Sequence, residues 1–265
     1  KTVIAGYHWF EDWGRDAFIS MSGLMLITNR TEEAKQVFLT FKRYCQKGLI
    51  PNHFPDDPQQ PPAYNTVDAS LWYINAVLQF LKYTNDLPFV KENLWSTLKE
   101  IIQWHVNGTL YEIKMDTDYL LKHGPQLTWM DVIIGKQPIT PRNGKAVEIQ
   151  ALWYNALKTV ELLAMKFGEK EEADKYRFLA EKAKESFRDK FWCEEKGYLF
   201  DVILNESKDD TLRPNQIFAV SLDFPLLEKE KALKMITAVQ EKLLTPYGLR
   251  TLSPDHPNYI GTYIG

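Results

Sequence analysis

An acidic residue set among apolar neighbours is the clearest chemical feature of this sequence. Asp131 follows Trp129 and Met130 and precedes Val-Ile-Ile, within the stretch QLTWMDVIIG at residues 126–135. A carboxyl group with apolar neighbours loses solvation, so its pKa rises, and a raised pKa is what a general acid in glycoside hydrolysis requires. An aspartate in a turn or at a helix cap is an equally good interpretation from the sequence alone.

A second cluster lies near the start of the chain, in HWFEDWGRDAFIS at residues 8–20. It combines two Trp and three acids with Arg15, and no ionisable side chain follows between Ala17 and Ile27. Arginine beside a carboxylate can hold vicinal hydroxyls, and aromatic faces can cover the C–H surface of a sugar. The alternative is that Asp16 caps the helix that follows while Arg15 is solvated.

Three further polar residues stand at the start of other apolar segments. Asp68 precedes ASLWYINAVLQFL, Glu148 opens IQALWYNAL, and Asn215 comes before IFAVSL. Each has an ordinary structural explanation, because Asp and Asn are common N-cap residues and acids are favoured in the first turn of a helix.

Two kinds of helical segment alternate along the chain. Segments that are apolar nearly all round are typical of a protein interior, and amphipathic ones of a surface. The apolar segments are 17–27, 69–81, 149–167 and 217–222, and the amphipathic ones are 31–46, 87–106, 170–190 and 228–244. This order predicts four helical hairpins, each with an inner and an outer member.

The connections between these segments differ in length. Links from an inner to an outer helix are short, and links back to the next inner helix are long. If the helices alternate in direction, all the long links lie at one end, and long loops in compact domains are usually functional or disordered. We therefore expect a site at the N-termini of the inner helices. Trp72, Trp104 and Trp153 lie within helices and are expected in the core.

Composition excludes several classes of function. The 265 residues carry a net charge of −3 and no basic cluster, so we expect no nucleic-acid partner. No apolar run is long enough to span a bilayer, so no membrane partner is expected. Two cysteines make no disulfide framework and indicate a reducing, cytoplasmic location. No zinc-binding spacing and no Gly-rich phosphate loop occurs, so we predict no metal and no cofactor.

Seven segments together resemble the amylo-α-1,6-glucosidase domain of glycogen debranching enzymes, with archaeal and bacterial members the most similar. The resemblance runs in order over essentially the whole chain. The segments are AGYHWFEDWGRDAFIS (5–20), GLIPNHF (48–54), YNTVDASLWY (64–73), QLTWMD (126–131), VEIQALWYNAL (147–157), RPNQIFAVSL (213–222) and GLRTLSPDHPNYIGTYIG (248–265).

The resemblance implies an all-α fold, an (α/α)6 barrel of six inner and six outer helices. It implies hydrolysis, with inversion, of α-1,6-linked glucose at the branch points of glycogen or another branched α-glucan. Asp131 matches the aspartate that the family uses as general acid, and Arg15 with Asp16 matches a pair that holds the terminal glucose. The residues expected to line the glucose subsite are Trp13, Trp129, Asp68, Glu148 and Asn215.

One departure from the family concerns the number of hairpins. The chain supplies about four where the family has six, so we expect residues 1–265 to be a single domain, the N-terminal two-thirds of the barrel. The family's general base, a glutamate, is then expected beyond residue 265. We expect the isolated chain to hydrolyse little, and its partner to be the remainder of the barrel or a second copy. The alternatives are another inverting six-hairpin glycosidase of the glucoamylase or trehalase type, or a glucan-binding piece without turnover.

Overall fold

Apolar and amphipathic helices alternate in the computed structural model, which describes residues 1–57 and 59–262. The last three residues of the 248–265 segment therefore lie outside the described part. The apolar helices are α1 (Gly14–Met21) with the π-helix η1 (Ser22–Leu26), α3 (Ala69–Thr84), α6 (Val147–Phe167), and α8 (Phe218–Ser221) with the 3-10 helix η4 (Pro214–Ile217). The amphipathic helices are α2 (Thr31–Arg43), α4 (Leu87–Phe89) with the π-helix η2 (Val90–Leu94) and α5 (Trp95–Asn107), α7 (Lys170–Phe191) and α9 (Lys229–Leu243).

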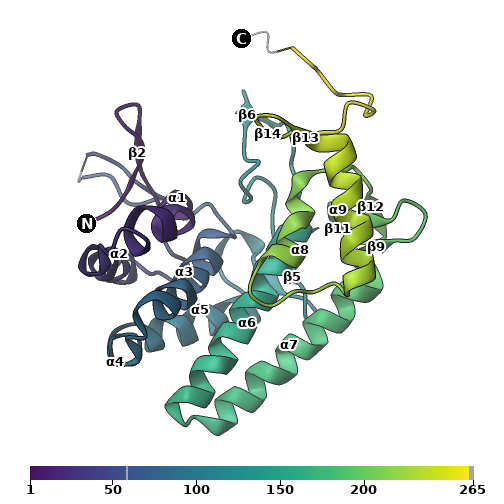
Figure 1. The fold of residues 1–265 in the computed structure, drawn as a ribbon. Helices are drawn as coiled ribbons and strands as arrows, with labels where there is room; N and C mark the ends of the chain where they lie inside the picture. The colour runs from purple at the N-terminus through teal and green to yellow at the C-terminus, as the bar shows by residue number, and fades with distance from the viewer. Residues whose placement is uncertain (58, 263–265) are drawn as a thin grey trace.

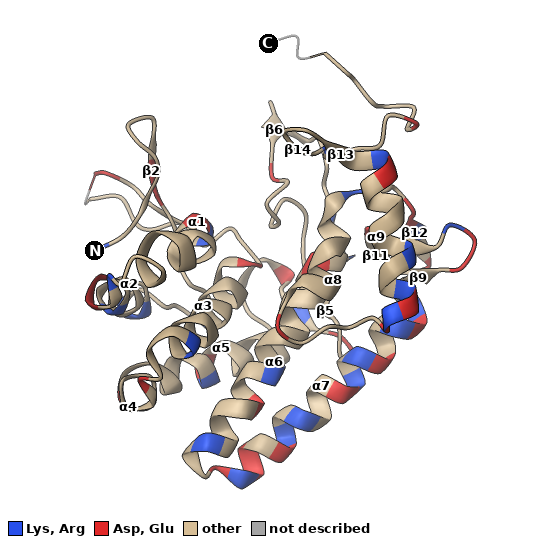
Figure 2. Cartoon of the chain, in the orientation of Figure 1, with Lys and Arg blue, Asp and Glu red and all other residues tan. Residues whose placement is uncertain are grey.

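The apolar helices form an inner layer. α1 packs against α3, α3 against α6, and α6 against α8, while α7 lies along the outer side of α6. Figure 2 shows the difference in charge, because α7 alternates blue and red over its length while α3 is almost entirely uncharged. The predicted alternation of inner and outer helices is confirmed for these elements.

An aromatic cluster joins the first two hairpins. The Phe18 ring meets the Tyr73 ring edge-on, with 5.0 Å between ring centroids, and the Phe41 ring at 4.8 Å. Phe38 packs between Tyr73 and Phe80 in the same cluster. All five rings are buried, and each contributes about 1.5–3 kcal/mol through removal of apolar surface from water. This cluster fixes α1 against α3 and so positions the start of both helices.

The short links have the local chemistry of tight helix ends. α3 ends at Asn85 and α6 at Gly168, both with a left-handed backbone, φ 52° and 81°. A left-handed residue at this position ends a helix while its N–H still bonds back into the last turn. The next helix then begins at once, as where the Asp86 carboxylate accepts a hydrogen bond from the Phe89 N–H at 3.1 Å.

The long links hold short antiparallel strands, so the expectation of an all-α chain is wrong for this part. Six small sheets occur among the described residues, and two of them have three strands, in the orders β1-β2-β3 and β12-β11-β8. Strands of two to four residues carry too little alternation to be recognised in a sequence. The strands are β1 (Ile4–Gly6), β2 (Phe10–Trp13), β3 (His53–Phe54), β4 (Lys114–Met115), β5 (Leu121–Lys122), β6 (Ile133–Ile134), β7 (Gln137–Pro138), β8 (Lys145–Ala146), β9 (Trp192–Cys193), β10 (Tyr198–Leu199), β11 (Val202–Leu204), β12 (Ser207–Asp209), β13 (Leu244–Thr245) and β14 (Gly248–Leu249).

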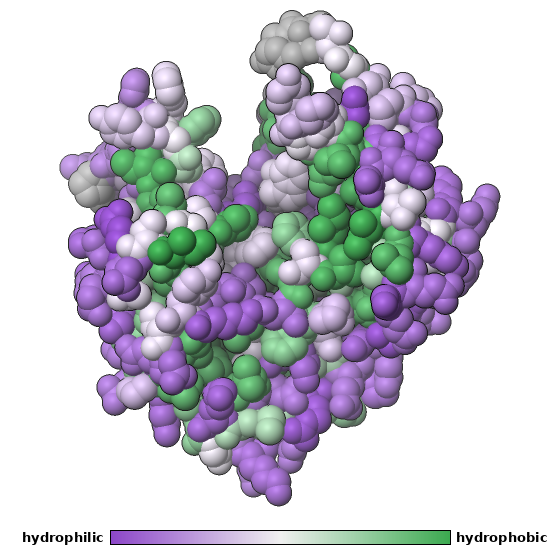
Figure 3. Space-filling model, viewed as in Figure 1, coloured by the Kyte–Doolittle hydropathy of each residue, from purple (hydrophilic) through white to green (hydrophobic). Residues whose placement is uncertain are grey.

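Two of the short links and several of the long ones lie on different sides of the molecule. In Figure 1 the turns from α3 to α4 and from α6 to α7 lie at the lower side, and β2, β6, β13 and β14 lie at the upper side. Figure 3 shows a hollow between the part that contains α1 and the part that contains α8 and α9, with apolar surface on both flanks. Exposed apolar side chains of the first and last hairpins include Leu24, Ile27, Leu233 and Ile236. None of the described helices is both long and apolar enough to cross a membrane.

Two histidines are buried without a charge partner, and they predict acid sensitivity of the fold. Burial lowers the pKa of His105 and of His123 from an ordinary 6.5 to about 4. The unfolded chain therefore takes up protons first as the pH falls through 6.5 toward 4. Each histidine should lower the free energy of unfolding by about 1.4 kcal/mol per pH unit in that window.

Substitution of one of the two histidines tests this expectation. His105 Nδ1 donates to the Ile101 carbonyl at 2.8 Å and its ring stacks on Trp153, so Leu can replace it in an apolar site. Urea denaturation at pH 7, 6 and 5 should give a shallower loss of stability for His105→Leu than for the wild type. His8→Leu, at an exposed position, is the control and should leave the pH dependence unchanged. If the free energy of unfolding falls with pH equally steeply in the wild type and in His105→Leu, buried His105 does not cause the acid sensitivity.

Candidate functional site

The starts of the inner helices meet at one pocket of about 560 Å³. Six of the seven residues predicted to bind a sugar line it, together with apolar side chains from the same helices. The lining residues are Arg15, Asp16, Ile19, Asp68, Trp72, Trp129, Glu148, Leu152, Pro214, Asn215, Ile217, Phe218 and Leu249. The structure therefore brings together segments that are up to two hundred residues apart, and their role in binding stays a prediction.

Arg15 joins the first two inner helices across this pocket. Its Nε donates to the Asp68 carboxylate at 2.7 Å, and its Nη2 donates to the Thr66 hydroxyl at 3.2 Å. The Thr66 hydroxyl in turn donates to the other oxygen of Asp68. Asp68 stands at the N-cap position of α3, but its side chain makes no capping hydrogen bond. The capping interpretation of Asp68 is therefore wrong, and its carboxylate orients Arg15 instead.

Asp16 and Trp13 differ in their relation to the pocket. Asp16 lies in the first turn of α1 and lines the pocket, and the N-cap of that helix is Trp13, so Asp16 is no cap. Trp13 is not among the residues that line the pocket. Its ring packs on the His53 ring, with 4.7 Å between centroids, inside the β2-β3 pairing. This sheet holds the chain where it enters α1.

Asp131 lies beside the Arg15 end of the pocket. Its carboxylate Oδ2 is 3.8 Å from Arg15 Nη1, and its side chain is 34% exposed. Burial raises the pKa of Asp131 above its ordinary value, Arg15 opposes the rise, and the charges of Asp68 and Asp16 add to it. The direction agrees with the effect expected from its apolar neighbours in the sequence.

Trp129 is held at the rim by a chain of hydrogen bonds. Its indole Nε1 donates to Asn215 Oδ1 at 2.8 Å, and Asn215 Nδ2 donates to Asp201 Oδ1 at 2.8 Å. Trp129 as a residue is 38% exposed, so part of it is accessible from solvent. Asn215 therefore links the loop before Asp131 to the fourth inner segment.

A buried arginine lies beneath this rim. Arg142 donates to Asp201 through Nε at 2.8 Å and Nη2 at 3.0 Å, and it forms a two-point ion pair with Glu148. Its Nη1 also donates to the Thr128 hydroxyl at 3.2 Å. Burial alone would lower the pKa of Arg142, but the two carboxylates outweigh it and raise the pKa. Arg142 thus ties the loop at residues 128–131 to α6 and to the segment before β11.

Strand pairing explains how Asp201 reaches Arg142. β11 pairs with β8 directly before α6, with Val202 opposite Ala146, and the Val147 N–H donates to the Asp201 carbonyl at 2.9 Å. Arg142 itself has a left-handed backbone, with φ 42°, which is unusual for a residue other than glycine. Such a backbone conformation persists where surrounding contacts hold it in place. Here the guanidinium makes five hydrogen bonds to other side chains, and these hold Arg142 in this conformation.

Three residues at the site are absent from the sequence-based list. Trp72 is buried in the core as expected, at 7% exposure, and it also lines the pocket, where it meets Phe218 edge-on at 5.3 Å. Arg142 and Asp201 lie in long links where no helical pattern points to them. The position of Asp201 between Phe200 and Val202 was the available signal, since an acid in an apolar run needs a buried partner. Of the other two tryptophans, Trp153 is fully buried as expected, and Trp104 is 36% exposed, contrary to expectation.

The arrangement suits a neutral ligand with several hydroxyls. Arg15 offers hydrogen-bond donors, Asp16 offers acceptors, and Trp72 and Trp129 offer aromatic faces. These groups complement the hydroxyl groups and the C–H faces of a pyranose ring. Among the described residues, no group of three or more His, Cys, Asp or Glu is placed to hold a metal ion.

Comparison with known proteins assigns the family. Residues 1–265 match the protein family described as amylo-alpha-1,6-glucosidase. The chain belongs to this family. A glycogen debranching enzyme of Saccharomyces cerevisiae is 29% identical over an alignment that covers 95% of this chain and 22% of that protein. A periplasmic trehalase of Salmonella schwarzengrund is 31% identical over 129 residues, covering 47% of this chain and 22% of the trehalase.

Two solved structures share the fold of this family member. A GH78 family rhamnosidase of Bacillus sp. GL1 superposes with a TM-score of 0.62 at 17% identity, over 90% of this chain and 23% of that one. A rhamnosidase from Klebsiella oxytoca with rhamnose bound gives 0.60 at 14% identity, over 86% of this chain and 41% of that one. The chain therefore has a helical fold like that of these glycosidases, and it spans about a fifth of the length of its curated relatives.

The buried ion network predicts a strong dependence of stability on Arg142. Arg142→Met leaves Glu148 buried without a cation and leaves Asp201 with Arg213 Nε alone, at 3.7 Å, which should lower the free energy of unfolding by about 3–5 kcal/mol. The control is Arg177→Met, which removes an ion pair with Glu161 and Asp174 from an arginine that is 41% exposed. Urea midpoints should fall strongly for the first variant and change little for the second. Similar small changes for both would refute a structural role for the network.

Proposed function

We propose that this chain supplies the glucose-binding pocket and the general acid of an inverting glycoside hydrolase that removes α-1,6-linked glucose at glycogen branch points. The observation that carries the proposal is the Asp131 carboxyl group, half-buried with a raised pKa beside a pocket that is rich in polar and aromatic side chains. Membership in the amylo-alpha-1,6-glucosidase family supports the substrate class.

Arg15 and Asp16 are proposed to hold the terminal glucose. Arg15 is preorganised by Asp68, so its guanidinium need not reorient when a sugar hydroxyl arrives. Trp129, fixed through Asn215, and Trp72 then cover the apolar faces of the ring. Glu148 lies at the base of the pocket, where its pairing with Arg142 gives it a supporting role.

Asp131 is proposed to donate its proton to the glycosidic oxygen as the bond from that oxygen to the anomeric carbon breaks. The remaining glucan leaves as an alcohol, and the carboxylate that forms is stabilised by Arg15 Nη1 at 3.8 Å. An inverting reaction also needs a second carboxylate, about 6.5–9.5 Å away, to activate water on the opposite face. Glu148 is fully engaged by Arg142 and is a poor candidate, so this base stays a prediction for a glutamate beyond residue 265.

The wider architecture is proposed to be an (α/α)6 barrel, with residues 1–265 as a single domain that contributes its first four hairpins. The similarity to the rhamnosidase structures supports a helical glycosidase fold. The hollow between α1 and α8, with apolar side chains on both flanks, is where further hairpins would pack.

Removal of the proposed acid gives a direct test. In the complete protein, Asp131→Asn should lower the rate of glucose release from a branched limit dextrin by about 10²–10⁴-fold while dextrin binding is retained. Asp57→Asn, in an exposed loop, is the matched control and should be as active as the wild type. Unchanged turnover in Asp131→Asn would exclude Asp131 as the acid.

A trehalase-type activity is the second candidate, because part of the chain matches periplasmic trehalases. Glucose release should be measured from a branched limit dextrin, from linear maltoheptaose and from trehalose under the same conditions. We expect release from the branched dextrin alone. Preference for trehalose would replace the proposed substrate while leaving the role of Asp131 intact.

A further inference from the structure

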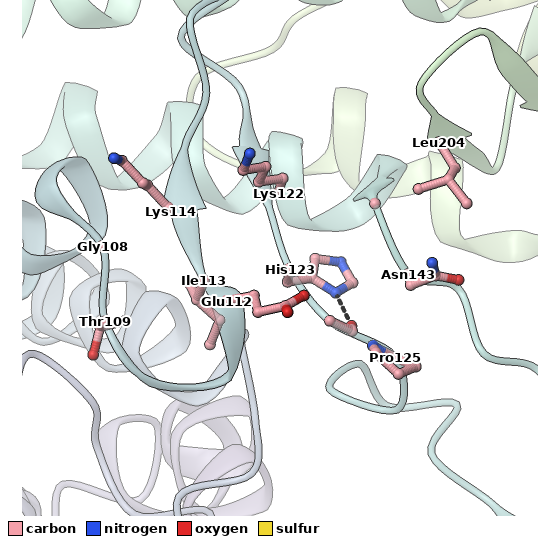
Figure 4. A pocket seen from close by; sticks show the side chains of 12 residues that line it. Gly108, Thr109, Glu112, Ile113, Lys114, Lys122, His123, Pro125, Asn143 and Leu204 are labelled. Carbon is pink, nitrogen blue, oxygen red and sulfur yellow. Dashed lines mark hydrogen bonds between the residues drawn. The ribbon is translucent and has the colours of Figure 1, made fainter.

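A second pocket, of about 480 Å³, lies between the segments 108–125 and 143–144. It shares no lining residue with the first pocket. We propose that it is a separate glucan-binding subsite that holds a malto-oligosaccharide segment, an inference that rests on the proposed function for the class of ligand. Figure 4 shows the polar side chains of Glu112, His123 and Asn143 gathered around this space.

His123 is the decisive residue of the pocket. It is 3% exposed, and its Nδ1 lies 2.8 Å from the Gly124 carbonyl oxygen, which can only accept, so Nδ1 carries the proton. Nε2 is then a hydrogen-bond acceptor, and it has no partner among the residues that the structure describes. A buried polar atom without a partner is costly, and a small shift of the pocket wall would let a ligand hydroxyl donate to Nε2, which is closed to solvent in this structure.

The other polar groups complement a polyol rather than an ion. Glu112 adds carboxylate acceptors next to His123, whereas Lys114, Lys122 and the Asn143 amide add donors. Burial keeps His123 neutral, so its Nε2 accepts a hydrogen bond from a hydroxyl and offers no donor to a phosphate. Ile113, Pro125 and Leu204 supply apolar wall for the C–H surface of a sugar. Alternating donors and acceptors with apolar patches match a neutral carbohydrate.

The frame of the pocket is preformed. His123 and Gly144 exchange two backbone hydrogen bonds, of 3.0 and 2.9 Å, and the Gly124 N–H donates to the Tyr111 carbonyl at 3.1 Å. Gly144 has φ 104°, and a Cβ atom there would lie 2.5 Å from the Ile203 carbonyl oxygen. Only glycine allows this close approach of the two segments. A rigid frame lowers the entropic cost of holding a flexible oligosaccharide.

The pocket is elongated by a neighbouring cavity. A second space of about 300 Å³ adjoins it and shares Lys122, Gly144 and Leu204 as lining residues. The second space is lined by Lys145, which pairs with Asp116 and Asp118, so polar side chains continue beyond the first space. Two adjoining spaces of this kind match a short chain of sugars better than a single one.

Calorimetric titration with maltoheptaose tests the proposal. The wild-type chain should bind at two sites, and His123→Phe should remove one of them. Glu112→Gln, at an exposed position that does not threaten folding, should weaken the same site at least tenfold. Arg15→Gln should remove only the other site. His105→Phe is the matched control, since His105 is equally buried with a free Nε2 but lines no described pocket, and it should retain both sites.

Imidazole NMR resonances give a second readout that leaves His123 itself unchanged. Maltoheptaose should shift the His123 signals in the Arg15→Gln variant and leave those of His105 unchanged. The proposal is overturned if His123→Phe and Glu112→Gln both retain two sites, or if inorganic phosphate shifts His123 where maltoheptaose does not. If Arg15→Gln still binds maltoheptaose at two sites, this result would instead count against the proposed function of the first pocket.

Discussion

The pairing of buried Arg142 with Glu148 and Asp201 is the interaction on which the rest of the site depends. A buried charge needs an opposite charge close to it. The guanidinium of Arg142 therefore fixes the positions of the two carboxylates. Through Thr128 and Asn215 the same network fixes the loop that carries Trp129 and Asp131. The helices form the scaffold, but this network sets where the loop lies on it.

The site has two layers that differ in their exposure to solvent. The lower layer is Arg142, Glu148 and Asp201, all nearly inaccessible to solvent. The upper layer is Arg15, Asp131 and Trp129, partly exposed and able to contact a ligand. Each upper residue is oriented by a neighbour, as Arg15 is by Asp68 and Trp129 by Asn215. Preorganisation of this kind lowers the cost of reaching a reactive geometry.

The sequence predicts the scaffold better than it predicts the network. The inner and outer helices can be predicted from hydrophobic periodicity, which depends only on local spacing. The position of the site at the starts of the inner helices can be predicted from the alternation of short and long links. Arg142 and Asp201 meet only because β8 and β11 pair across more than fifty residues, and strands of two or three residues leave no pattern to read. Trp72 is in the core as predicted, but its place in the pocket wall could not be predicted, since a helix that is apolar all round does not reveal which side faces a cavity.

The direction of the inner helices has an electrostatic consequence. α1, α3 and α6 all begin at the first pocket, so their unpaired backbone N–H groups place a partial positive charge there, of about half an elementary charge per helix. A sugar that loses its leaving group develops positive charge at the anomeric carbon, which this backbone field opposes. Of the acids that line the pocket, Asp68 is paired with Arg15 and Glu148 with Arg142, whereas Asp16 has no ion pair among the described residues. The negative charge of Asp16 therefore offsets part of the field that the helices themselves produce at the pocket.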